Sequence, residues 1–101
     1  MVPKAVPPAA AALAHYLDHL SGERRASAHT LEAYGRDLDG FLAFMTDHVG
    51  SAPTLDELCA LRPADYRAWM ADRRRSGLSA CSLARELSAV RGFFKYVQRR
   101  W

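Results

Sequence analysis

The stretch SGLSACSLARELSAVRGFFKYVQRRW, residues 76–101, decides the fold. Gly77 ends the preceding segment, and Ser79 is a residue type that caps the start of a helix. Apolar residues then recur with helical spacing, which predicts a long amphipathic helix with its buried stripe at Leu83, Leu87, Val90, Phe94 and Val97. The opposite face carries Cys81, Arg85, Ser88, Gly92, Lys95 and Arg99, with Ser82 and Arg91 at its flanks.

Cations and small hydroxyls are mixed on this outward face. Small side chains allow a close approach to a duplex, and arginine reaches base edges or phosphates, so the mixture is typical of a helix in a major groove. A merely solvated helix more often interleaves Glu with Lys, and Glu86 is the only acid between Ser79 and Trp101. A solvated basic face remains the alternative.

Charge is divided unevenly along the chain. Residues 62–101 hold ten basic and three acidic residues, a net charge of +7, whereas the first 61 residues carry −4, which restores the total of +3. Such asymmetry indicates an electrostatic binding surface, and nucleic acid is the expected partner.

The fold class predicted from the rest of the chain is all-α. Apolar spacing predicts a first helix over residues 8–20, a second over 28–48 capped by Ser27, and a third that starts at Pro63. Thr54 and Glu57 match a capping box, which predicts a short helical turn between helices two and three. The expected architecture is a compact four-helix domain with that short extra turn.

Length and composition predict one domain. A chain of 101 residues with 50% hydrophobic residues can bury a single core, and we expect residues 1–8 to be a flexible leader and 9–101 the domain. No apolar run approaches the ~20 residues that span a bilayer. Cys59 and Cys81 lack disulfide or metal spacing, and His15 and His19 lack a third ligand, so we expect no metal, no cofactor and a cytoplasmic setting.

The start of the second helix offers a smaller candidate patch. Ser27, His29 and Thr30 surround free backbone N–H groups, which favour a phosphate, although Ser27 would cap the helix in any case. Tyr34 lies at the edge of the predicted core, where we expect it to be half packed.

Two strings carry a family resemblance. LSGERRASAHTLEAYGRDLDGFLAFM, residues 20–45, contains S-x-x-T-L-x-x-Y-x-x-D-L, and LRPADYRAWMADRRRSGLSACSLARELSAVRGFFKYV covers residues 61–97. Together they resemble the N-terminal core-binding (SAM-like) domain of Xer-type tyrosine recombinases, the XerC type more than the XerD type. The sequence departs from that family at Cys81, where a basic residue is frequent, and at Gly35 and Gly92, where a polar one is.

The resemblance implies a domain that clamps one face of duplex DNA at a recombination half-site, with its second and fourth helices in the major groove. A separate C-terminal domain, absent from this chain, would hold the catalytic residues, so no catalytic residue is assigned and no activity is expected of the chain alone. Carried over residue by residue, the implied DNA contacts are Ser27, His29, Thr30, Tyr34, Ser79, Ser82, Arg85, Ser88, Arg91 and Lys95.

The implied partners are double-stranded DNA, the catalytic domain and further recombinase subunits, and the implied task is chromosome-dimer resolution, with its links to chromosome partition and cell division, or DNA integration. Two other functions stay open. Residues 71–88, ADRRRSGLSACSLARELS, also resemble two helices across a tight glycine turn, as in a small helix-turn-helix regulator. A helical protein-interaction module with an acidic partner would bind duplex DNA weakly.

Overall fold

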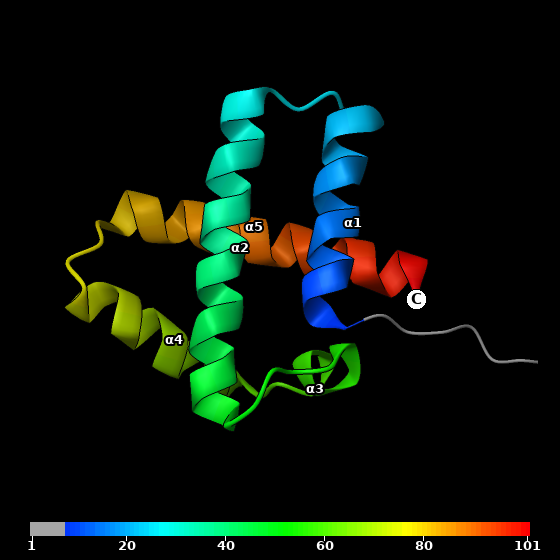
Figure 1. Ribbon diagram of the computed structural model, residues 1–101. Coiled ribbons are helices and arrows are strands. Elements are labelled where there is room, and N and C mark those ends of the chain that lie inside the picture. The colour runs from blue at the N-terminus through cyan, green and yellow to red at the C-terminus, as the bar shows by residue number, and fades with distance from the viewer. Residues whose placement is uncertain (1–7) are drawn as a thin grey trace, which may run out of the picture.

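The computed structural model describes residues 8–101, and this part of the chain is helical without a strand (Figure 1). Its helices are α1 (Ala9–Gly22), α2 (Ala28–Val49), α3 (Leu55–Cys59), α4 (Pro63–Arg75) and α5 (Ala80–Arg100). The predicted all-α class, with a short extra helix between the second and third long ones, is confirmed. The predicted leader lies outside the described residues except for Pro8, which forms an isolated antiparallel bridge with Thr54.

Local sequence signals set the starts of the helices. The hydroxyl oxygens of Ser27 and Ser79 each accept a hydrogen bond of 3.1 Å from the backbone N–H three residues on. Thr54 and Glu57 form the predicted capping box, in which each side chain accepts a hydrogen bond from the backbone N–H of the other. Pro63 occupies the first turn of α4, where its missing N–H has no helical partner to lose.

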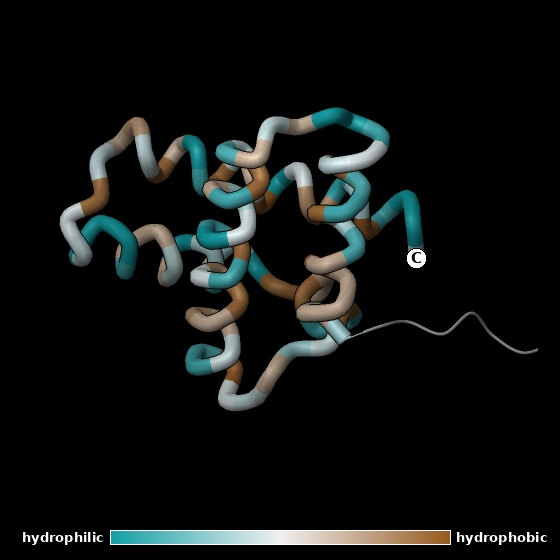
Figure 2. Tube along the Cα trace, turned by 45° about the horizontal axis from the view of Figure 1, so that its top comes forward, coloured by the Kyte–Doolittle hydropathy of each residue, from teal (hydrophilic) through white to brown (hydrophobic). Residues whose placement is uncertain are grey.

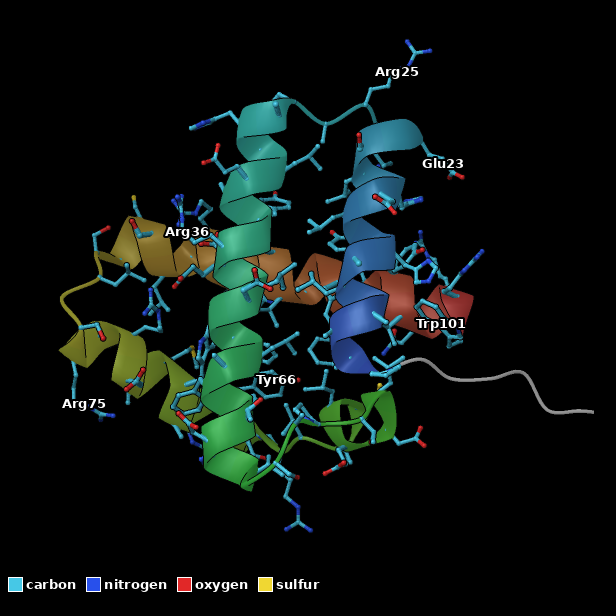
Figure 3. All side chains as sticks on the ribbon, viewed as in Figure 1. Glu23, Arg25, Arg36, Tyr66, Arg75 and Trp101 are labelled. Carbon is cyan, nitrogen blue, oxygen red and sulfur yellow. The ribbon has the colours of Figure 1, made fainter. Side chains whose placement is uncertain are left out.

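Left-handed backbone redirects the chain between the helices. Gly50 ends α2 at a φ of 101°, and Gly77 turns the chain from α4 to α5 at a φ of 85°. Arg25 has a φ of 50° in the turn between α1 and α2, and its side chain extends away from the domain (Figure 3). Because the chain reverses there, the end of α1 and the start of α2 lie at the same end of the molecule (Figure 1).

The core lies where α5 crosses the antiparallel pair formed by α1 and α2. Figure 2 shows brown apolar residues in the region where these helices approach one another. Phe41 of α2 packs edge-on against Trp69 of α4, with ring centroids 5.1 Å apart, and against Phe94 of α5 at 6.2 Å. The most completely buried large side chains are Trp69, Phe41, Phe93, Leu38, Met45, Leu58 and Val90.

The buried face of α5 differs from the predicted stripe. Leu83, Val90 and Val97 are buried as predicted, but Leu87 and Phe94 are only half-buried. Three residues outside the predicted stripe are buried: Glu86, Ala89 and Phe93. The physical reason is that α5 contacts α1 and α2 as well as α4, so its buried arc is wider than one apolar stripe.

Candidate nucleic-acid interface

Exposed side chains form a continuous stripe along α5. Their spacing of three or four residues keeps them on one face of the helix. The stripe consists of Cys81, Ala84, Ser88, Arg91, Lys95 and Gln98, with Arg85 and Arg99 beside it. The residues predicted to contact DNA on this helix and at its N-cap are exposed, except for the half-exposed Ser82; the exposed ones are Ser79, Arg85, Ser88, Arg91 and Lys95.

The starts of α2 and α5 share one hydroxyl arrangement. The Ser27 hydroxyl accepts from the Thr30 N–H and donates to the Thr30 hydroxyl oxygen at 2.9 Å. The Ser79 hydroxyl likewise accepts from the Ser82 N–H and donates to the Ser82 hydroxyl oxygen at 3.0 Å. A hydroxyl has one hydrogen to donate, and those of Thr30 and Ser82 are not used in these pairs. Capping and anion binding are therefore compatible at both helix starts.

Arg85 forms a two-pronged ion pair with Asp37 of α2. Its Nε and Nη2 donate to the two carboxylate oxygens at 3.1 and 3.0 Å. The Asp37 side chain is only 3% exposed, whereas that of Arg85 is 46% exposed. The fork ties α5 to α2 and uses two of the five N–H donors of the guanidinium. Arg85 therefore holds the two candidate helices together and keeps donors on its outer edge.

A second two-pronged ion pair joins α5 to α4. Arg73 donates from Nε and Nη2 to the carboxylate of Glu86 at 3.1 and 3.0 Å, and the Glu86 side chain is 6% exposed. The hydrogen bonds to Glu86 raise the pKa of the Arg73 guanidinium above its usual value. Two neighbouring residues of α5 thus form ion pairs with different helices: α5 supplies the base, Arg85, in the pair with α2 and the acid, Glu86, in the pair with α4. Arg73 is consequently withdrawn from the basic surface.

The candidate residues of α2 differ in exposure. Ser27 and His29 are exposed, Thr30 is half-exposed, and Tyr34 is half-buried against the core, as the sequence predicted. Because Asp37 meets Arg85, the two helix starts can be placed relative to that contact. Ser27 precedes Asp37 by ten residues, or about 15 Å of helix, and Ser79 precedes Arg85 by six, or about 9 Å.

Sequence reasoning missed the two carboxylates that organise this face. Asp37 and Glu86 are each only 4% exposed, and a buried acid normally has a basic partner. The sequence did not reveal that burial at Asp37, because the charged residues Arg36 and Asp39 lie beside it. Their basic partners, 48 and 13 residues away, could not be identified without the arrangement of the helices.

The described residues offer little to other kinds of site. Within residues 8–101, no helix is long and apolar enough to cross a membrane. The same range holds no group of three or more His, Cys, Asp or Glu able to hold a metal ion. Cys59 and Cys81 are free and exposed.

Comparison with known proteins gives one consistent result. Residues 13–100 match the family described as phage integrase, N-terminal SAM-like domain. The chain is 45% identical to the tyrosine recombinase XerC of Rhizobium meliloti over 84 residues, which are 83% of this chain and 26% of that protein. It is 49% identical to XerC of Methylobacterium nodulans over 88 residues, 87% of this chain and 27% of the relative.

A third relative, XerC of Mesorhizobium japonicum, is 42% identical over 96 residues, which cover 95% of this chain and 31% of that protein. The chain therefore spans about a quarter to a third of the length of the curated relatives it matches. No solved structure matches it significantly.

Proposed function

This chain belongs to the family of phage integrase N-terminal SAM-like domains, and from that premise we propose that it is the duplex-DNA-binding module of a site-specific tyrosine recombinase of the XerC type. The module clamps a recombination half-site through the start of α2 and the outward face of α5. Catalysis of strand exchange belongs to a separate C-terminal domain. The task in the cell is recombination of chromosomal DNA in the cytoplasm, in company with further recombinase subunits.

The exposed stripe of α5 is the observation that carries this proposal. It combines cations with small side chains over the whole length of the helix, and the buried Glu86 adds no negative charge to it. A duplex presents a regular array of phosphates, which attracts such a surface, and a groove into which small residues fit closely.

The length of α5 means that different sections of the helix contact different parts of the DNA. The helix has 21 residues and is about 32 Å long, whereas the major groove is about 12 Å wide. A straight helix of that length can follow the curved groove only over part of its course. We therefore assign the base edges to the section around Ser82, Arg85 and Ser88, and phosphates to Arg91 and Lys95.

The helix starts supply the remaining contacts. Free N–H groups and the helix dipole favour a phosphate at the start of α2 and of α5. Thr30 and Ser82 add hydroxyl donors there, and His29 adds an exposed ring. Tyr34 is half-buried against the core, so it contributes more by packing than by direct contact with DNA.

A groove between α4 and α5 favours the protein-interaction alternative. It has a volume of about 640 Å³, and its walls include the half-buried Tyr66, Met70, Leu87 and Phe94. An amphipathic helix with acidic flanks would fit such a site, because Arg67 and Arg91 lie at the same groove. The helix-turn-helix alternative is weaker, because α5 continues past α4 to pack on α1 and α2.

Fluorescence anisotropy tests the proposed function. The chain is titrated onto a labelled Xer half-site duplex, a scrambled duplex of equal composition and the matching single strand, each at two salt concentrations. We expect the half-site to bind most tightly and the affinity to fall steeply with salt. Equal binding to both duplexes would reduce the function to a general phosphate clamp. Absence of binding at low salt would favour the protein-interaction module.

A further inference from the structure

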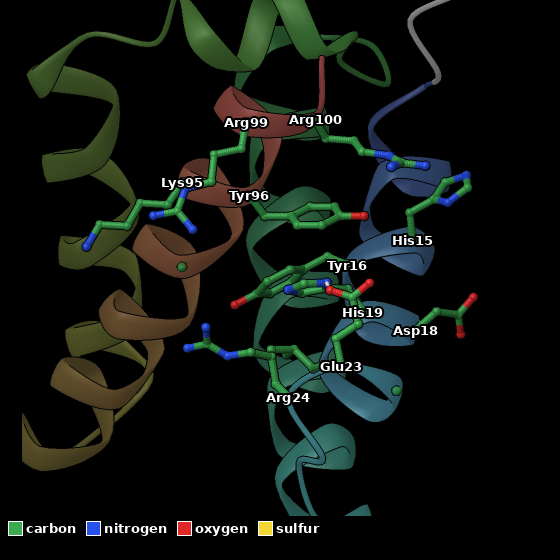
Figure 4. Close-up of a pocket in the computed structure, with 13 residues that line it drawn as sticks. His15, Tyr16, Asp18, His19, Glu23, Arg24, Lys95, Tyr96, Arg99 and Arg100 are labelled. Atoms are coloured by element: carbon green, nitrogen blue, oxygen red, sulfur yellow. Dashed lines mark ion pairs between the residues drawn. The ribbon is translucent and has the colours of Figure 1, made fainter.

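A cleft lies between α1 and the C-terminal half of α5, beside the exposed stripe (Figure 4). Its volume is about 650 Å³. Four Lys or Arg side chains from two separate elements line it: Arg24 from the turn after α1, and Lys95, Arg99 and Arg100 from α5. Sequence reasoning had assigned no role to Arg24, and only Lys95 of the four stood among the predicted DNA contacts.

Arg24, Lys95 and Arg99 form no ion pair with a carboxylate among residues 8–101. Two acids also lie on the cleft wall: Glu23, which contacts His19 at 3.3 Å, and Asp18, which points away from Arg24 (Figure 4). The four Lys and Arg side chains outnumber these two carboxylates, so the lining has a net positive charge. Such an excess of cations attracts an anion from outside.

The hydroxyl of Tyr16 points to the same side of the cleft as Arg24 and Arg99 (Figure 4). The ring is fixed by packing on Phe93 at 5.8 Å and on Tyr96 at 5.3 Å. Burial is the main cause that raises the pKa of Tyr16, so the phenol keeps its proton at neutral pH. It is therefore available as a hydrogen-bond donor.

Gly92 makes room for this hydroxyl. A Cβ at position 92 would lie 2.6 Å from the Tyr16 oxygen, too close for any side chain without a shift. The family resemblance leads one to expect a polar residue here, and the glycine instead lets the phenol oxygen lie against α5. The arrangement that results is two guanidinium groups and one phenol O–H on the same side of the cleft (Figure 4).

We propose that this cleft holds one backbone phosphate of the bound duplex, through Arg24, Arg99 and the Tyr16 hydroxyl. The proposal rests on the proposed function and adds a contact to it. Lys95 belongs both to the cleft wall and to the α5 stripe, and Arg24 leads directly into the turn before Ser27. The DNA backbone that passes the start of α2 would thus make a second contact in the cleft beside α5.

The salt dependence of binding provides the test. Arg24→Ala and Arg99→Ala are compared with Arg62→Ala, which removes the same charge. Arg62 lies near the opposite end of α2, because its backbone N–H donates to Asp65 of α4, and Asp65 meets His48 of α2 at 2.8 Å. Because α2 has 22 residues, that end is about 33 Å from its start. Because the two arginines share one phosphate, we expect the Arg24→Ala, Arg99→Ala double variant to lower the salt slope of the binding constant by about one, and each single variant to lower it by part of that, equally on half-site and scrambled duplex. Arg62→Ala should leave the slope unchanged.

A neutral methylphosphonate placed at single positions of the duplex locates the contact. One position should weaken wild-type binding and leave the Arg24→Ala, Arg99→Ala double variant unaffected. Unchanged salt slopes in both cleft variants, while the wild type still binds duplex, would overturn the cleft assignment alone. No duplex binding by the wild type would overturn the proposed function. Competition by inorganic phosphate that depends on the arginines, with DNA slopes unaltered, would mean a site for free phosphate instead.

Discussion

The pairing of Asp37 with Arg85 shows how a single contact changes the interpretation of a candidate binding residue. A helical wheel correctly placed Arg85 away from the apolar stripe, but it fixes only where a side chain begins. The long arginine side chain ends on a carboxylate that is 3% exposed on another helix. The sequence predicted Arg85 as a DNA contact, and the structure adds a role in joining α2 to α5.

We expect Arg85→Ala to lower the free energy of unfolding by about 1–3 kcal/mol, because it leaves the buried Asp37 carboxylate without two hydrogen bonds. Chemical denaturation measures this. Arg91→Ala is the control: Arg91 is exposed on the same helix, and its loss should change stability by less than about 0.5 kcal/mol. Equal stability of Arg85→Ala and wild type would show that the fork contributes nothing to the fold.

Gly92 gives a prediction whose sign depends on its neighbour. In the wild type, Gly92→Ala should destabilise the domain, because the new Cβ would lie 2.6 Å from the Tyr16 oxygen. In a Tyr16→Phe background that oxygen is gone, and the next atom, the ring Cζ, is at 3.7 Å. There the better helix propensity of alanine should stabilise by about 0.5–1 kcal/mol.

Thermal and chemical unfolding of four proteins test this prediction: the wild type, Gly92→Ala, Tyr16→Phe and the double variant. The same sign of effect in both backgrounds would mean that the Tyr16 hydroxyl does not lie over α5 as described. Because Tyr16→Phe also removes the proposed phosphate donor, the stability cycle is measured without DNA.

The helices themselves were largely predictable, and the width of their buried faces was not. The hydroxyl caps at Ser27 and Ser79, the capping box at Thr54 and the turn at Gly77 are local signals, so the predicted ends agree with the structure within two residues. The burial of Glu86, Ala89 and Phe93 depends on which helices surround α5, and no local pattern contains that information. Most of the outward face of α5 was predicted, but Gly92, predicted to lie on it, is half-buried because Tyr16 of α1 lies against it. Ala84 and Gln98 are exposed and were not predicted.

Two substitutions on α5 compare the predicted stripe with the observed one. Phe93 is 1% exposed, so Phe93→Ala should destabilise by about 3–5 kcal/mol, as expected for a buried aromatic residue. Leu87 is half-buried, so Leu87→Ala should fall below the roughly 2–5 kcal/mol of a fully buried leucine. Denaturant midpoints measured side by side rank the two, and a larger effect at Leu87 would restore the predicted register and contradict the observed one.

Across the domain, the uneven charge of the sequence becomes a surface with a defined geometry. Carboxylates pair with Arg73, Arg75 and Arg85, so the net charge of residues 62–101 overstates the cations that are free to meet DNA. The remaining basic stripe of α5 runs beside the α1–α5 cleft. The sequence predicted the sign of this surface and its main helix. It did not predict that α1 and the turn after it form one wall.

Amide chemical-shift mapping of the labelled chain with a half-site duplex tests the central claim most directly. If the start of α2 and the outward face of α5 form the DNA surface, the largest changes will fall on residues 24–30 and 79–95. The amides of α3 and of the first turn of α4 will change little, because they lie at the opposite end of α2 (Figure 1). Changes confined to α3 and α4, or no change on saturation with duplex, would contradict the account.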